Sequence, residues 1–260
     1  MKSTSTDLRP DSKTQLILTM GGRGGVGKTV ALVAIADYLQ TKGHKFFVTD
    51  CDTENAGKIS SFSHWFKETA VTLNLRNTSD CDKLLEGSAN SKAPFVLADL
   101  PSNASGDLAA WWKDVVTPET LRELGIGVTA VGVVTPARGS GESVWEWIDT
   151  LGPNVRYLIA LNRLGFERVP APKEEAFKHW FALDTKHLQL QTFEIPHLHD
   201  PAMEAMTVLG KLPSKAFQGT ELFVLPRQRI KQWRDAIHKQ LDGLNVFLPA
   251  KSENMASANA

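Results

Sequence analysis

The chain has 260 residues, of which 42% are apolar and 8% aromatic, enough to bury the core of one large soluble domain. Its formal net charge is zero, which excludes a molecule that binds nucleic acid through its overall charge and leaves room only for a local basic patch. Its two cysteines, Cys51 and Cys81, are too few and too widely spaced for a zinc knuckle or a disulfide framework.

The two ends of the chain differ in composition from the rest. The leader at 1–13 and the tail at 249–260 are polar and have little to bury, so both are expected to be disordered around a single domain at 14–248. No run of 18 apolar residues and no secretory signal is present, which predicts no integral membrane segment. With so few cysteines, a reduced, cytoplasmic location is expected.

Apolar segments typical of strands alternate with helical patterns along the domain. The predicted strands lie at 15–20, 45–50, 70–75, 93–100, 127–136, 155–161 and 189–195. The predicted helices lie between the first loop and about Gln40, then at 141–151, 172–182, 200–209 and 226–243. Near-continuous apolar strands separated by helices indicate a sheet buried on both faces. We therefore predict an α/β three-layer sandwich, with a mainly parallel, twisted sheet of about seven strands and helices on both faces.

The last predicted helix, at 226–243, is amphipathic and basic. Its apolar residues recur at spacings of three and four, and it carries five Lys or Arg residues against two Asp. A helix docked on the domain is the favoured interpretation. A membrane-surface or partner-binding helix is the alternative.

The segment MGGRGGVGKT at 20–29 lies between the first strand and the first helix and satisfies the P-loop pattern Gly-x-x-x-x-Gly-Lys-Thr. Its glycines let successive backbone N–H groups converge on phosphate oxygens, and the helix N-terminus adds partial positive charge. Lys28 is expected to neutralise the β- and γ-phosphates, and the Thr29 hydroxyl to bind magnesium. The segment therefore predicts nucleotide binding.

Two acidic loops follow later strands, at the edge where open α/β sheets bind their ligands. VTDCDTEN places Asp50 and Asp52 two residues apart, pointing the same way if the strand continues past them. FVLADLPSN ends a strand with Asp99, as a Walker B carboxylate does. A lone aspartate after a strand is often a cap or turn residue, so the functional interpretation depends on the P-loop beside these residues.

Together these motifs resemble the ParA/MinD group of ATPases, P-loop proteins of the SIMIBI class whose deviant Walker A loop reads Lys-Gly-Gly-x-Gly-Lys-Thr. RGGVGKT matches that loop from Gly24 to Thr29, and the two acidic loops are similar to the family's two switches. The resemblance continues through VVTPARGS, LNRLG and EIPHLHDPAMEAMTVLGKLP, and covers roughly residues 15–215. The basic ending LPRQRIKQWRDAIHKQLD most resembles the plasmid-encoded TraL/StbB/MobD-type proteins of conjugative transfer and plasmid stability.

The resemblance implies that the protein binds ATP and Mg²⁺, forms a nucleotide-sandwich homodimer and hydrolyses ATP slowly. It implies that Asp52 helps to position the attacking water and that Asp50 is the structural neighbour of Asp52. It also implies that Asp99 binds magnesium. It places Asn162 against adenine and the loop at Pro196 on the other side of the base.

Arg23 occupies the position where the family has a lysine that crosses the dimer interface to the partner's phosphates. A guanidinium keeps the charge but changes the geometry, because a planar fork and a point charge are not interchangeable. Three outcomes stay open: an efficient finger acting in the partner, ATP binding with slow hydrolysis, or an outward-pointing bystander.

The predicted site residues fall into three groups. The predicted catalytic residues are Arg23, Lys28 and Asp52. The predicted metal-binding residues are Thr29, Asp52 and Asp99. The predicted nucleotide-binding residues are Gly22, Arg23, Gly24, Gly25, Val26, Gly27, Lys28, Thr29, Val30, Asn162 and Pro196.

The expected partners are a second copy of the chain on ATP binding and a plasmid transfer or partition protein. Non-specific DNA is a further candidate, through the basic last helix. Two alternative functions remain: a switch that binds ATP and recruits partners with negligible turnover, and small-molecule phosphoryl transfer, for which the sequence shows no substrate pocket. HLHD at 197–200 is favoured as a base-side loop and helix cap over a metal site. The tryptophans are favoured as core and interface residues.

Overall fold

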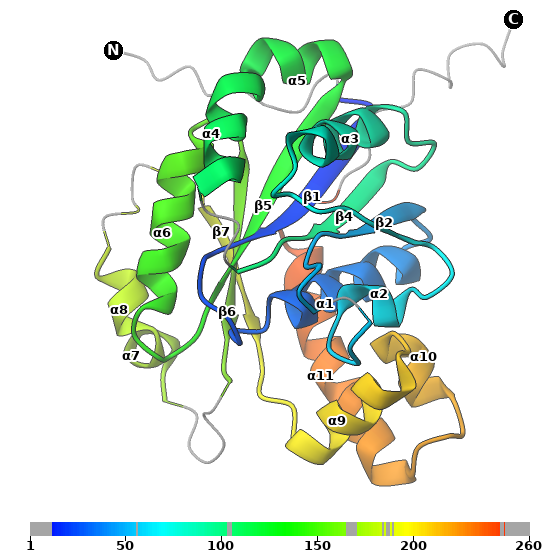
Figure 1. Cartoon of the computed structure of the whole chain (residues 1–260). Helices are drawn as coiled ribbons and strands as arrows, with labels where there is room; N and C mark the ends of the chain where they lie inside the picture. Colours follow the sequence, from blue (N-terminus) through cyan, green and yellow to red (C-terminus); the bar gives the residue numbers. More distant parts are fainter. Residues whose placement is uncertain are drawn as a thin grey trace, which may run out of the picture.

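The computed structural model describes residues 12–55, 57–102, 106–164, 171–183, 185, 188, 190–244 and 247 (Figure 1). Apart from residues 12 and 13, the predicted leader lies outside the described residues, and so does the whole of the predicted tail.

Seven parallel strands form one sheet, and the sheet follows the apolar segments of the sequence. The strands are β1 (Thr14–Met20), β2 (Phe46–Asp50), β3 (Ala70–Thr72), β4 (Phe95–Asp99), β5 (Ile126–Val134), β6 (Arg156–Asn162) and β7 (Leu190–Ile195). Their order across the sheet is β3-β2-β4-β1-β5-β6-β7, and every neighbouring pair is parallel. Because all strands run the same way, the loops that follow them lie at one edge.

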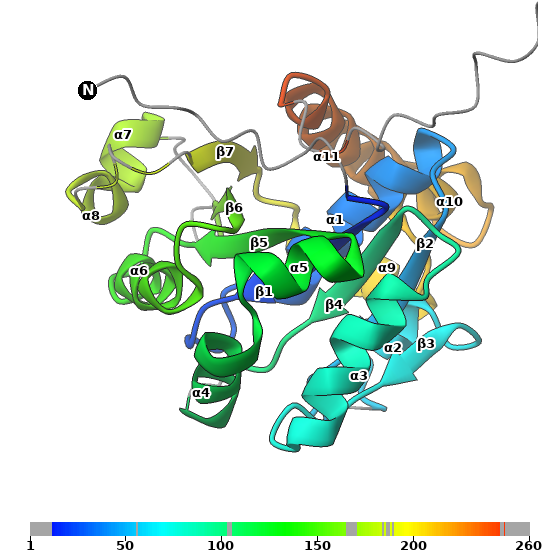
Figure 2. The same cartoon turned by 90° about the horizontal axis from the view of Figure 1, so that it is seen from above.

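Helices cover both faces of this sheet. They are α1 (Lys28–Thr41), α2 (Phe62–Trp65), α3 (Thr78–Ala89), α4 (Gly106–Val115), α5 (Pro118–Leu124), α6 (Ser140–Leu151), α7 (Lys173–Ala176), α8 (Lys178–Phe181), α9 (Asp200–Leu209), α10 (Pro213–Gln218) and α11 (Val224–Asp242). Figure 2 shows α3, α4, α5 and α6 on one side of the sheet and α1, α10 and α11 on the other.

Alternate residues of the central strands enter two separate cores. On β1, Leu16 and Leu18 pack with α3 to α6, whereas Ile17 packs with α1 and α11. A strand buried on both faces has no polar side, which is why these segments read as nearly continuous apolar runs. The predicted three-layer α/β sandwich is confirmed, and its sheet is wholly parallel.

Most predicted elements lie where the sequence places them, with differences at helices. The segment predicted as one helix at 172–182 is two short helices, because Phe177 leaves helical geometry between α7 and α8 (φ −113°, ψ 28°). The helices α2, α3, α4, α5 and α10 were not predicted.

The last helix, α11, is docked on the domain, as the favoured interpretation predicts. Its apolar stripe, Ile230, Trp233, Ile237 and Leu241, is at most 3% exposed and packs in the core that contains α1. The stripe is therefore not free to lie on a membrane surface. Of the tryptophans at Trp111-Trp112 and Trp145-x-Trp147, all but the partly buried Trp145 are buried in the other core.

A buried carboxylate on α1 anchors both C-terminal helices. Asp37 is fully buried, and it accepts hydrogen bonds from the N–H and hydroxyl of Ser214 on α10, each at 2.8 Å. From α11, His238 Nε2 lies 3.1 Å and Arg234 Nε 3.6 Å from Asp37 Oδ2. The helix that begins at the P-loop is thus joined to α10 and α11 by one side chain.

Replacing Asp37 with alanine should lower the free energy of unfolding by about 3 kcal/mol, because it leaves buried partners unpaired. Urea unfolding at neutral pH measures this loss. Asp242→Ala is the matched control, since Asp242 also joins α11 to α1, through Tyr38 and Lys42, but is exposed. Equal losses in the two variants would show that burial of Asp37 does not strengthen the anchor.

Candidate nucleotide-binding site

The loops that follow β1, β2, β4, β6 and β7 border one cavity of about 400 Å³ at the carboxyl-end edge of the sheet. A cavity of this size falls in the range of small-molecule and cofactor sites. Nearly all the predicted site residues line it: Gly24, Gly25, Val26, Gly27, Lys28, Thr29, Val30, Asp52, Asp99, Asn162 and Pro196. Gly22 and Arg23 lie outside the cavity lining.

The backbone geometry of the P-loop requires glycine at two positions that line the cavity. Gly25 and Gly27 have φ of 72° and 94°, in the left-handed region. At Gly27 a Cβ would also lie 2.5 Å from Asn162 Nδ2. That amide donates a 2.8 Å hydrogen bond to the carbonyl of Val26, so the end of β6 holds the P-loop in place. Asn162, predicted to contact adenine, therefore already has its Nδ2 engaged with the loop.

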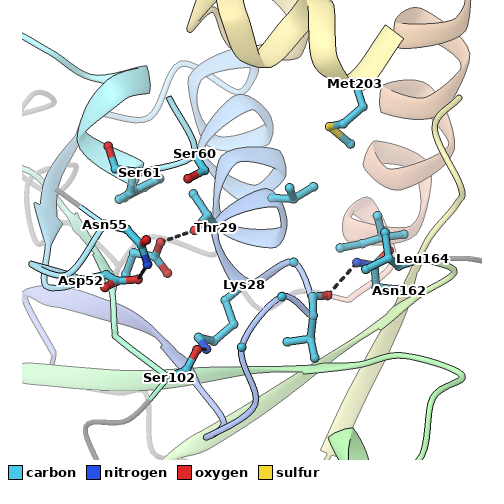
Figure 3. Close-up of a pocket in the computed structure, with 18 of the residues that line it drawn as sticks. Lys28, Thr29, Asp52, Asn55, Ser60, Ser61, Ser102, Asn162, Leu164 and Met203 are labelled. Atoms are coloured by element: carbon cyan, nitrogen blue, oxygen red, sulfur yellow. Dashed lines mark hydrogen bonds between the residues drawn. The ribbon is translucent and has the colours of Figure 1, made fainter. Parts of the chain in front are cut away.

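Lys28 is folded into the loop that it follows. Its Nζ donates to the carbonyls of Gly21 and Arg23 at 3.2 and 3.3 Å and to Ser102 Oγ at 2.5 Å. Burial lowers the pKa of Lys28, and the nearby carboxylates of Asp99 and Asp52 oppose that effect. The ammonium group thus lies at the polar end of the cavity, beside the second acidic loop (Figure 3).

Asp99 is a deeply buried carboxylate that lines the cavity. Its Oδ2 accepts a 2.6 Å hydrogen bond from Thr29 on α1, and its Oδ1 a 2.9 Å bond from Thr19 on β1. Burial raises the pKa of Asp99 to about 6, against the opposing effect of the two hydroxyl donors and Lys28. A threonine hydroxyl and a carboxylate are hard oxygen ligands, and the 2.6 Å contact between Thr29 and Asp99 brings them to the same point. These two predicted metal residues fit Mg²⁺.

Asp50 and Asp52 have different environments, because β2 ends at Asp50. Asp50 is fully buried and its carboxylate accepts the backbone N–H groups of Asp52 at 3.1 Å and Ser63 at 2.8 Å. Asp52 lines the cavity and accepts a 2.7 Å hydrogen bond from Asn55 Nδ2. The sequence predicts that the two carboxylates point the same way only if the strand continues past Asp50. The strand ends at Asp50, so this condition is not met.

Arg23 points to the loop after β5. Its guanidinium donates to the backbone carbonyl of Arg138, and a Cβ at Gly139 would lie 2.5 Å from Arg23 Nη1. Gly22 is held nearby, since its N–H donates to Ser143 Oγ on α6 at 2.5 Å. The Arg23 cation is therefore turned away from the cavity of its own chain.

The other end of the cavity is more apolar. The sequence analysis predicted only some of the residues that line it. Leu164, Ile195, Leu198 and Met203 line it with Pro196. Figure 3 shows Leu164, Asn162 and Met203 opposite Asp52 and Asn55. The cavity thus runs from a charged end suited to phosphates to an apolar end suited to a base.

Several lining residues were not predicted as site residues, among them Asn55, Ser61 and Ser102. Asn55 and Ser102 belong to the two acidic loops of the sequence analysis, which was the available signal, whereas Ser61 lies beyond the first loop, directly before α2. His197 and Asp200 of HLHD also line the cavity, whereas His199 is exposed. Within the described residues, no group of three or more His, Cys, Asp or Glu side chains is placed to hold a metal ion.

A family model matches the first part of the domain. Residues 17–98, which include the P-loop and the first acidic loop and end one residue before Asp99, match the model "CobQ/CobB/MinD/ParA nucleotide binding domain". This part of the chain is therefore similar to the nucleotide-binding domains of the ParA/MinD type. No described helix combines the length and the apolar character needed to cross a membrane.

Individual proteins with this domain resemble the chain over most of its length. Protein MobD from Acidithiobacillus ferrooxidans is 24% identical over 88% of this chain and 97% of MobD. The structure of the MinD cell division protein from Aquifex aeolicus is 17% identical and covers 92% of this chain and 100% of MinD, with a TM-score of 0.52.

A protein described as a plasmid partition protein from Borrelia burgdorferi B31, bound to AMPPNP, is 14% identical and covers 89% of this chain and all of its own, with a TM-score of 0.50. FtsY chains of the same fold are longer: this chain spans 62% of the chloroplast FtsY from Physcomitrella patens, with 19% identity over 74% of this chain and a TM-score of 0.50. At these identities, the solved structures establish a shared fold.

The raised pKa of Asp99 predicts a pH-dependent stability in the absence of Mg²⁺ and nucleotide. Because the folded state favours the neutral carboxyl, the stabilisation is fully present below about pH 4 and is lost as the pH rises through about 6. The change from 3.8 to about 6 corresponds to about 3 kcal/mol. Asp99→Asn should therefore exceed the wild type in unfolding free energy by about that amount at pH 8.

Urea unfolding of both proteins between pH 4 and pH 8 measures this difference. All other titrating groups are shared, so the difference between the two curves isolates Asp99. It should shrink towards pH 4, and a difference that stays constant across the range would contradict the assignment.

Proposed function

We propose that the protein is a ParA/MinD-type ATPase that binds ATP and Mg²⁺ in a nucleotide-sandwich dimer and hydrolyses ATP slowly. The observation that carries the proposal is one cavity that joins the P-loop, the Thr29–Asp99 pair and Asp52 to an apolar end. The AMPPNP held by the plasmid partition protein of the same fold supports ATP as the nucleotide.

In the proposed reaction, phosphates replace the internal partners of Lys28. Its ammonium leaves Ser102 and the loop carbonyls and neutralises the β- and γ-phosphates. Thr29 and Asp99 hold Mg²⁺, which supplies charge neutralisation at the phosphates when bound. Asp52 orients the attacking water from the edge of the cavity.

Arg23 completes the site of a second copy of the chain. It lies outside its own cavity and is bonded to the carbonyl of Arg138, so its charge does not reach the phosphates of its own chain in this conformation. Released from that carbonyl, a guanidinium at this position supplies the cation that the family sends across the dimer. It then stabilises charge on the transferring phosphoryl group, as an arginine finger does.

We further propose that this ATPase serves plasmid transfer or partition in the cytoplasm. Support comes from the resemblance of its ending to TraL/StbB/MobD-type proteins and from the match that covers 97% of MobD. Non-specific DNA is a second candidate partner, because Arg229, Lys231 and Lys239 lie exposed on the outer face of α11. DNA binding of this kind would weaken steeply as salt is added.

Mixing two inactive variants tests whether Arg23 acts in the partner. Arg23→Ala and Asp52→Asn should each lower ATP turnover by at least about 100-fold. In a mixed dimer, the site of the Arg23→Ala protomer has its own Asp52 and receives Arg23 from its neighbour. Phosphate release should therefore reappear on mixing, and its rate per protomer should rise with protein concentration.

Arg23→Ala should still bind ADP like the wild type, because Arg23 does not line the cavity. A mixture that stays inactive, or turnover per protomer that is constant at high dilution, would remove Arg23 from the partner's site. Dimerisation on ATP without any phosphate release would favour the binding switch over the enzyme.

A further inference from the structure

The loop at the apolar end of the cavity is held from outside by two side chains of α11. Trp233 Nε1 donates a 2.8 Å hydrogen bond to the carbonyl of Pro196. Gln240 bonds twice to the backbone of Glu194: its Oε1 accepts from the N–H at 2.8 Å, and its Nε2 donates to the carbonyl at 3.0 Å. Neither Trp233 nor Gln240 lines the cavity.

These bonds determine the path of the chain where it enters the cavity wall. β7 is the edge strand of the sheet, so its outer backbone groups have no neighbouring strand. The amide of Gln240 takes the place of such a strand at Glu194. One residue beyond β7, Pro196 has no N–H, so its carbonyl is the backbone group available to fix it. The residues held in this way continue directly into Pro196, His197 and Leu198 of the wall.

The helix that provides these bonds is itself fixed relative to the P-loop. Trp233 is 3% exposed, and Ile230 and Ile237 are fully buried in the core that contains α1. Arg234 and His238 reach Asp37 on α1, the helix that begins at Lys28. One path of buried contacts therefore runs from the phosphate end of the cavity through α11 to the base end.

We propose that Trp233 and Gln240 are positioning residues for the base end of the nucleotide, and that α11 sets the affinity for the nucleoside part without touching it. The inference rests on the proposed function, because it assigns the apolar end of the cavity to the nucleoside. It adds a role that the P-loop motifs do not contain, since base binding depends on a helix that begins near residue 224.

The experiment compares a ligand that has a base with one that lacks it. ATP and inorganic tripolyphosphate, both with Mg²⁺, compete for the site against a fluorescent ATP analogue. The variants are Trp233→Phe, which keeps an aromatic ring but loses the donor, and Gln240→Met, which keeps the length but loses the amide. Trp111→Phe is the control, because it removes an indole hydrogen bond, to Asp82, on the other side of the sheet.

In both α11 variants, ATP affinity should fall by at least about fivefold, since Trp233→Phe removes one hydrogen bond and Gln240→Met two, while tripolyphosphate affinity changes by less than about twofold. The control should leave both affinities unchanged. A merely structural role would weaken both ligands together. Gln240 is half-buried, so Gln240→Met keeps the test available if Trp233→Phe does not fold.

The possible failures are distinguishable. If the wild type binds tripolyphosphate and ATP equally, or if both α11 variants bind ATP like the wild type, the inference is wrong while nucleotide binding stands. A parallel loss of both ligands in the variants also overturns it. If the wild type binds neither ligand, the proposed function itself fails.

Discussion

The hydrogen bonds from Thr19 and Thr29 to the buried carboxylate of Asp99 hold the functional edge of the molecule together. They join β1, β4 and the first turn of α1 at one point, at 2.9 and 2.6 Å. This is possible because β1 and β4 are neighbouring parallel strands whose carboxyl ends meet. The carboxylate whose pKa burial raises lies at the end of the cavity where phosphates and Mg²⁺ are proposed to bind. Burial of the Asp99 carboxylate lowers the free energy of unfolding, and it holds the site residues in place before a ligand binds.

A second buried carboxylate, Asp37, attaches the C-terminal part of the chain to the helix that begins at the P-loop. It ties α10 and α11 to α1, so the helix that carries the most basic segment is also part of the core. This packing buries the apolar stripe of α11, and exposed charged side chains form the outer face of the helix. We interpret α11 as an internal support whose outer side remains available to a partner.

The sequence predicted the sheet well because the central strands β1, β4, β5 and β6 are buried on both faces and stand out as apolar runs. It missed α3, whose inner face includes Cys81 and Ser88 and so does not show a clear apolar stripe. It also joined α7 and α8, since the backbone change at Phe177 leaves no trace in the apolar pattern. The phosphate end of the cavity was predictable, because motifs at strand ends must meet at one edge, whereas Leu164, Leu198 and Met203 at the apolar end were not predicted as site residues. Two contacts were not predictable: Arg23 meets a carbonyl 115 residues away, and Trp233 one 37 residues away. Backbone carbonyls carry no sequence signal.

The central claim is that ATP, held in this cavity, brings two copies of the chain together so that each completes the other's site. Sedimentation velocity of the wild type with Mg²⁺ and either AMPPNP or ADP tests it most directly. The account predicts a dimer with AMPPNP and a monomer with ADP, because only the triphosphate offers the γ-phosphate that a partner's Arg23 would reach. The same sedimentation coefficient with both nucleotides would contradict it.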